Sequence, residues 1–212
     1  QLAILETATW LPLILLLFDL AVERGTRYYV TAGVALGVAA LAGHPQTFLF
    51  VGYASVIFFV WRILNCELRI TKSRFAFYVL RFALVVLIAV GIAAAQFVPT
   101  LEYQTLSTRA GISWAEASRG FPSLDPLQMI LPGFASAFQS PLYVGIFQLW
   151  LALYALFVKR SREKTFWILL TLGSLVVSFG AYVFAYALFY LFIPGFALFR
   201  GQERLALVVS FS

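Results

Sequence analysis

Charge is scarce in this chain. Only 11% of its 212 residues are charged, whereas an ordinary soluble domain carries about 25%. Hydrophobic residues make up 62% of the chain and aromatic residues 17%. This composition excludes an ordinary soluble domain and is typical of an integral membrane protein, so the lipid bilayer is the first partner that we expect.

Reactive and metal-binding side chains are scarce as well. One cysteine, Cys66, and one histidine, His44, cannot build a disulfide framework or a zinc site. No P-loop, Gly-rich dinucleotide fingerprint or HExxH motif is present, so nothing indicates ATP chemistry. The sequence identifies no cofactor and no metal-ligating residues, and no residue pattern supports a divalent metal.

The basic residues are placed as a membrane topology requires. Eleven of the fifteen Lys and Arg residues lie in three gaps between apolar runs, although the net charge is +6. A nucleic-acid partner would need a basic stripe instead, so we expect none. The positive-inside rule puts the gaps at Arg24, Arg69 and Arg160 in the cytoplasm.

The apolar runs predict an all-α fold, a polytopic transmembrane helical bundle. Runs 8–22, 28–42, 48–64, 75–101, 143–158 and 165–180 would each cross once, with 28–64 as a helical hairpin. The run 181–193 is too short to cross and fits an interfacial or re-entrant helix. The chain lacks an initiator Met and stops inside the apolar run 205–211. We therefore expect a single transmembrane domain over 1–212, truncated at both ends.

Residues 99–141 form the only long stretch that is not membrane-like, and we interpret them as an extracytoplasmic cap. Asp125 is predicted to N-cap a short helix that begins at Pro126 and stops at Pro132. The same orientation places His44, Gln46 and the segment 200–204 on the external side. Polar residues that topology does not require thus gather at one surface, where they are functional candidates.

His44 and Gln46 lie in a turn of sequence Gly-His-Pro-Gln-Thr between two apolar runs. His44 can donate a hydrogen bond to a phosphate or carry a proton. Alternatively, both side chains satisfy backbone groups at the two helix ends. The sequence leaves both interpretations open.

Glu102 follows Pro99 by three residues, which predicts a place in the first turn of an external helix. There it is a candidate general base. A surface ion pair between Glu102 and Arg109 explains the two residues equally well.

Arg200 and Arg204 are four residues apart, so a helix would place both on one face. Two guanidinium groups at a membrane surface suit a phosphate, which they bind through paired hydrogen bonds. Contact with lipid headgroups is the alternative.

Several short segments together resemble a known family. They are ATWLPL at 8–13, AGHPQT at 42–47, AAQFVPT at 94–100 with Ser107 and Arg109, YVG at 143–145, and PGF at 194–196 with Phe199, Arg200 and Arg204. In this order, over nearly the whole chain, they resemble the YfhO family of bacterial membrane proteins. The resemblance implies a GT-C-type membrane glycosyltransferase, a helical bundle with external interfacial helices in the bacterial cytoplasmic membrane.

Such enzymes move a sugar from a polyprenyl-phosphate donor to an acceptor, often a cell-envelope glycopolymer or glycolipid. The resemblance implies that an external carboxylate deprotonates the acceptor hydroxyl, while Arg109, Arg200 or Arg204, with His44, stabilises the departing phosphate. In the superfamily the principal carboxylate usually lies in the first external loop, which we expect to precede this chain. Glu102 is therefore a substitute candidate.

Two other functional classes remain as alternatives. A transporter or lipid flippase would need ionisable residues near the middle of the bilayer, often with internal repeats. Asp19 and Arg81 lie near predicted helix ends instead, and no repeat is visible. A non-catalytic membrane scaffold is the third possibility.

Overall fold

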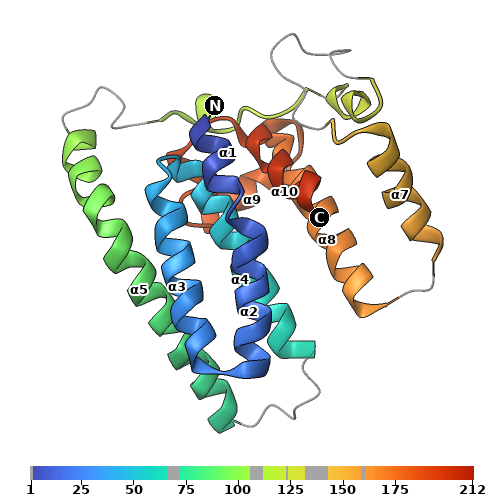
Figure 1. The fold of residues 1–212 in the computed structure, drawn as a ribbon. Coiled ribbons are helices and arrows are strands. Elements are labelled where there is room, and N and C mark those ends of the chain that lie inside the picture. The colour runs from blue at the N-terminus through green and yellow to red at the C-terminus, as the bar shows by residue number, and fades with distance from the viewer. Residues whose placement is uncertain (1, 66–71, 106–111, 123, 132–142, 159–160) are drawn as a thin grey trace. The chain divides into compact units, whose positions relative to one another are not determined.

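The structure, a computed structural model, describes residues 2–65, 72–105, 112–122, 124–131, 143–158 and 161–212 (Figure 1). Most of these residues are helical, with no β-strand among them, which confirms the predicted all-α class. The chain forms two compact units, residues 1–110 and 111–212. The GT-C-like arrangement, the single domain over 1–212 and the cap over 99–141 stay predictions.

The first unit consists of helices whose direction alternates from α2 to α5. The end of α4 lies beside the end of α2, because Arg62 near the end of one contacts Glu23 near the end of the other. The first third of α5 lies beside the start of α3, where Nη2 of Arg81 donates to the Thr26 hydroxyl at 2.8 Å. Helices α3 and α4 thus run antiparallel on either side of a short turn, as the hairpin predicted over 28–64 requires, but only α4 is long enough to cross a membrane. The helices are α1 (Leu2–Ala8), α2 (Leu11–Arg24), α3 (Thr26–Leu41), α4 (Pro45–Asn65) and α5 (Lys72–Thr105).

Small residues let α3 approach α5 closely, as packed helices in membranes commonly do. A Cβ atom added to Gly33 would lie 2.9 Å from Cβ of Ile88, and one added to Gly37 would lie 2.7 Å from Cβ of Ile92. Both distances are below any normal carbon–carbon contact, so the two isoleucines occupy the space that the glycines leave. Because Gly33 lies against Ile88 and Gly37 lies against Ile92, α3 and α5 run in the same direction.

Among the residues that the structure describes, three helical segments are long and apolar enough to cross a membrane, which indicates a membrane protein. They are Leu2–Arg24, Pro45–Asn65 and Phe75–Tyr103. Only 11% of the most apolar 18-residue stretch of Phe75–Tyr103 is buried inside the structure, whereas 44% of the corresponding stretch of Pro45–Asn65 is buried. Most of the α5 surface is therefore left for lipid or for further protein. The identity of the membrane and the sidedness stay predictions.

The second unit is built from shorter elements. Phe121, Ala206 and Val209 form a buried cluster, and Met129, Leu175 and Phe179 pack against it. Helix α8 contacts α9 and α10. The elements are α6 (Trp114–Ala117), η1 (Asp125–Met129), α7 (Ile146–Phe157), α8 (Arg162–Ser178), η2 (Gly180–Tyr182), α9 (Ala185–Phe192), η3 (Phe196–Leu198), η4 (Gln202–Leu205) and α10 (Ala206–Phe211).

Two predictions for the second unit are wrong in detail. The helix expected over 143–158 spans only Ile146–Phe157, about 18 Å, because residues 143–145 are not helical. Asp125 is the first residue of the 3₁₀ helix η1 and not its N-cap, a position that Leu124 occupies. The helix therefore begins one residue before the predicted start, and Pro126, whose ring fixes a helical φ, is its second residue. The expected stop at Pro132 lies outside the described residues.

Candidate functional site

His44 lies immediately before α4 and caps it. Its Nδ1 atom accepts a hydrogen bond from the backbone N–H of Thr47 at 3.1 Å and lies 2.7 Å from the Thr47 hydroxyl. Pro45 occupies the first helical position, where a backbone N–H would have no partner inside the helix. Because Nδ1 accepts, the neutral ring carries its proton on Nε2. The structural role of His44 is thus shown, while its role toward a phosphate stays a prediction.

Gln46 and Gln96 lie with His44 at one end of the first unit. Gln46 is only 2% exposed. A Cβ atom on Gly43 would lie 3.7 Å from Nε2 of Gln96, so the turn before α4 meets the last third of α5. A ligand can reach Gln46 only if neighbouring side chains move, and its substrate-binding role stays a prediction.

Glu102 is exposed and lies near the end of α5, so the expected place in a helix's first turn is wrong. Helix α5 continues through Pro99, which deprives the carbonyl of Ala95 of its helical partner. Beside the proline, the Thr100 hydroxyl donates a hydrogen bond to the carbonyl of Gln96 at 2.7 Å, which helps to hold this turn of the helix. A carboxylate near a helix C-terminus gains nothing from the helix dipole. The local backbone therefore offers no anion stabilisation to Glu102.

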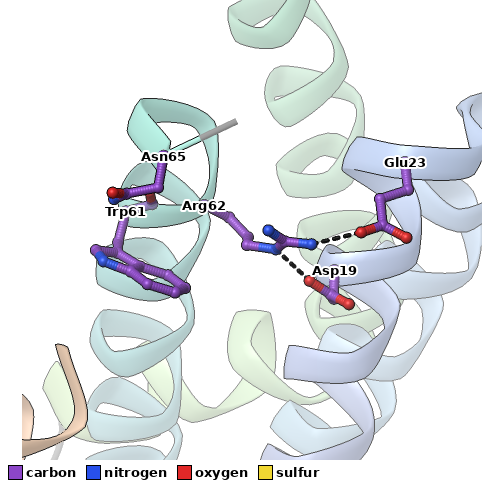
Figure 2. A network of polar contacts seen from close by, with 5 residues as sticks. All are labelled: Asp19, Glu23, Trp61, Arg62 and Asn65. Carbon is purple, nitrogen blue, oxygen red and sulfur yellow. Dashed lines mark hydrogen bonds and ion pairs between the residues drawn. The ribbon is translucent and has the colours of Figure 1, made fainter. Parts of the chain in front are cut away.

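The opposite end of the first unit carries an ion cluster that the sequence interpretation missed. Arg62 of α4 donates hydrogen bonds to Asp19 and to Glu23 of α2, as Figure 2 shows. Asp19 and Glu23 are four residues apart, and Arg62 is the only charge in its apolar run. The sequence could have indicated the cluster through these two facts, because carboxylates one turn apart on a helix share a face and can bind the same arginine. The cluster joins two helices and contains no candidate site residue.

Residues 117–121 lie at the centre of the second unit. This stretch, which begins at the last residue of α6, accepts backbone hydrogen bonds from two later parts of the chain and donates one. A Cβ atom on Gly120 would lie 2.3 Å from the carbonyl carbon of Phe179, so only glycine fits there. The bonds run from Ala181 N–H to Ser118 O at 2.7 Å, from Gln202 N–H to Arg119 O at 2.8 Å and from Phe121 N–H to Ser178 O at 3.0 Å.

Gln202 and Tyr186 form a buried polar pair beside this stretch. Nε2 of Gln202 lies 3.0 Å from the Tyr186 hydroxyl and donates to the carbonyl of Ala117 at 3.0 Å. The Tyr186 hydroxyl donates to the same carbonyl at 2.8 Å. Burial raises the pKa of Tyr186 to about 12. The sequence interpretation singled out the arginines around Gln202 and passed over Gln202 itself.

Arg119 and Arg200 are brought near one another by the hydrogen bond between Gln202 and Arg119. Both side chains are exposed, and both positive charges act on Glu116 and help to lower its pKa. The larger cause of that lower pKa is the Ser113 backbone N–H, which Glu116 accepts at 3.3 Å, followed by the Ser113 hydroxyl. Within the described residues, neither guanidinium forms an ion pair or hydrogen bond of its own. Both guanidinium groups are therefore open to solvent, and the Glu116 carboxylate is the charge that feels them both.

The expected helical face shared by Arg200 and Arg204 is wrong. Arg200 precedes the 3₁₀ helix η4 and is not helical, whereas Arg204 lies inside η4 and is half-buried. Gly201 lies between them with a left-handed φ of 82°, which redirects the chain. Arg200 instead acts with Arg119 on the carboxylate of Glu116. The predicted role of Arg204 stays a prediction.

Arg109 lies outside the described residues, so its predicted pair with Glu102 stays a prediction. Among the residues that the structure describes, no three His, Cys, Asp or Glu side chains come close enough to hold a metal ion.

The chain matches no protein-family model, no curated protein and no solved structure. The resemblance to the YfhO family stays a prediction, which rests on the sequence segments that carry it.

Proposed function

We propose that the chain belongs to a membrane glycosyltransferase of the bacterial cytoplasmic membrane. It would move a sugar from a polyprenyl-phosphate donor to a cell-envelope acceptor at the external face. The ordered series of sequence segments supports this proposal, and so do the three helices with the length and hydropathy of membrane spans. The ionisable cluster at Arg62 lies at helix ends and not at mid-span, which does not favour a transporter.

The observation that carries the proposal is that Arg119 and Arg200 are both exposed and both act on the carboxylate of Glu116. Arg200 belongs to the segment that resembles the family, and a backbone hydrogen bond between Gln202 and Arg119 joins this segment to the one that carries Arg119. Charge gathers on the leaving phosphate as the glycosidic bond breaks. Two guanidinium groups that reach the phosphate would stabilise that charge.

The general base that deprotonates the acceptor hydroxyl must be a residue other than these arginines. Glu116 is a poor candidate, because its hydrogen bonds with Ser113 lower its pKa and occupy its carboxylate. A base with a lowered pKa has less tendency to take the acceptor's proton. Glu102 has the exposure that an acceptor requires and remains the substitute candidate within this chain. His44 and Gln46 complete the proposed substrate-binding set in the first unit.

The test is sugar transfer by the full-length protein in native membranes supplied with radiolabelled polyprenyl-phosphate sugars. Arg119→Ala and Arg200→Ala are each expected to reduce transfer by about 10²-fold, the usual effect of removing one charge-stabilising donor. Arg162→Ala is the matched control, since Arg162 is an exposed arginine at the start of α8. It should transfer like the native protein.

A second pair of variants locates the base. Glu102→Gln abolishes transfer if the base lies in this chain, whereas Glu116→Gln leaves it unchanged. Transfer unaffected in both arginine variants, at normal expression, would show that the phosphate is bound elsewhere. No transfer from any donor would overturn the glycosyltransferase proposal and favour a transporter or scaffold.

A further inference from the structure

The turn between α2 and α3 directs two positive charges at one tyrosine hydroxyl. Arg24 is the last residue of α2, and Arg27 is the second residue of α3. Nη2 of Arg27 donates to the Tyr28 hydroxyl at 3.1 Å, and the guanidinium carbon lies 4.7 Å from the centre of the Tyr28 ring. The positive charge of Arg24 acts on the same hydroxyl. Both arginines are exposed, so both guanidinium groups remain accessible from outside the protein.

No carboxylate compensates these two charges within the described part of the chain. The carboxylates nearest to them in sequence are Asp19 and Glu23 of α2, and both bind Arg62 instead (Figure 2). Arg24 and Arg27 themselves form no ion pair with any described residue. Like charges that act on one atom repel one another, and a bound anion would turn that repulsion into attraction.

The hydrogen-bonding groups at this turn are donors. The oxygen of the Tyr28 hydroxyl accepts from Arg27, so its hydrogen stays available, and no described residue accepts from it. Each guanidinium has five N–H groups in a planar fork, of which Arg27 uses one here. Such a fork matches the paired oxygens of a phosphate, which it binds through two parallel hydrogen bonds. The turn therefore suits a phosphate group.

The turn also lies at the end of a helical segment that is long and apolar enough to cross a membrane. That segment is Leu2–Arg24. The end of a membrane span lies among the lipid headgroups, where the lipid phosphates are. Arg81 adds a third cation at the first turn of α3, because Nη2 of Arg81 donates to the Thr26 hydroxyl at 2.8 Å. Its guanidinium carbon lies 3.6 Å from the centre of the Phe77 ring, and this contact holds the charge in place.

We propose that Arg24, Arg27 and Tyr28 bind the phosphate of an anionic lipid headgroup. The two guanidinium groups hold the unesterified oxygens, and the tyrosine hydroxyl donates to one of them. A lipid is the source of the phosphate because the turn ends a membrane-crossing segment. The inference is independent of the proposed function, since α4 begins beside His44 and Gln46 and ends, at Arg62, beside this end of α2.

The test titrates the delipidated full-length protein, in a nonionic detergent, with phosphatidylglycerol and measures the bound lipid by native mass spectrometry. Phosphatidylcholine is the matched lipid, because it has the same phosphodiester but carries a choline cation that the arginines repel. Phosphatidylglycerol should bind about fivefold more tightly or better, the effect of one net charge at a lipid surface.

Arg24→Gln and Arg27→Gln should each weaken the binding of phosphatidylglycerol about fivefold, because each removes one basic residue from the headgroup. Tyr28→Phe removes only a neutral donor and should weaken binding less. Arg162→Gln is the control, since Arg162 is an exposed arginine at the start of α8. It should bind the lipid like the native protein. Without lipid, the thermal unfolding midpoints of the two arginine variants should change little, because both residues are exposed.

Equal affinity for phosphatidylglycerol in the native protein and in both arginine variants would overturn this site. An equal loss in Arg162→Gln would also overturn it, because the lipid would then respond to total charge and not to this turn. Displacement of the lipid by inorganic phosphate would show that the residues bind a free anion and would overturn the choice of a headgroup. None of these measurements involves sugar transfer, so a failure of the site and a failure of the proposed function are distinguishable.

Discussion

Nε of Arg62 donates a hydrogen bond to Oδ1 of Asp19, which joins α4 to α2 across 43 residues of sequence. Nη2 of the same guanidinium donates to Oε1 of Glu23 at 2.5 Å (Figure 2). The side chain of Arg62 is 21% exposed and that of Asp19 is 34% exposed, so water screens the pair only in part. The fork of one arginine therefore fixes two carboxylates of the neighbouring helix.

Arg62→Ala is expected to lower the free energy of unfolding by about 1–3 kcal/mol, between the values for exposed and for buried ion pairs. Arg62→Lys should recover part of that loss, because an ammonium keeps the charge but lacks the fork. Urea unfolding in detergent micelles measures the difference. A double-mutant cycle with Asp19→Ala isolates the pair, and a coupling energy of zero would contradict its importance.

Gly37 tests the close approach of α3 to α5. Gly37→Ala should destabilise the protein by about 1–3 kcal/mol, because the new Cβ atom would overlap Cβ of Ile92. Gly91→Ala, in α5, is the control, since nothing lies within 4 Å of a Cβ atom there. That control should be neutral or stabilising. Thermal unfolding midpoints compare the two, and equal midpoints would contradict the packing.

Tyr186 makes the second unit sensitive to alkaline pH. An unfolded tyrosine ionises near pH 10, whereas burial raises the pKa of Tyr186 to about 12. The folded state thus keeps a proton that the unfolded state has lost, and stability falls as the pH rises from about 10 to about 12. Tyr186→Phe should show a shallower fall over this range by pH-dependent unfolding. An identical pH profile in the variant would show that other groups cause the loss.

The helices were predictable where one local signal decided them. The runs 48–64 and 75–101 are apolar over almost their whole length, as membrane-spanning helices are, and their ends match those of α4 and α5 within a few residues. The charged pair between Arg62 and Asp19 was not predictable, because it depends on which helices become neighbours. Local signals identify a helix but not its partner.

The candidate site was predictable only as a set of residue types. Arg200 was found from its charge, but its neighbour Arg119 depends on a backbone hydrogen bond with Gln202 that no periodicity encodes. Glu102 was misplaced, because a proline normally ends a helix and α5 continues through Pro99. In long membrane helices, nearby hydroxyl groups and packing commonly compensate for a proline.

The structural and chemical roles of His44 can be tested separately, because asparagine can replace histidine as a helix cap but not as an imidazole. Its Nδ1 atom accepts from the backbone N–H of Thr47, a bond that an asparagine side chain can also accept. His44→Ala should cost about 1 kcal/mol of stability, and His44→Asn should cost little. Both follow from unfolding curves of the purified protein.

The same two variants then decide whether the imidazole contacts substrate. If Nε2 of His44 donates to the donor phosphate, His44→Asn should fold normally and still lose most sugar transfer, because the amide does not reach the same point. If capping is the only role, transfer in His44→Asn should equal that of the native protein, and His44→Ala should lose transfer only in proportion to the folded protein that remains. The first result would add His44 to the phosphate-binding groups, and the second would remove it from the candidate site.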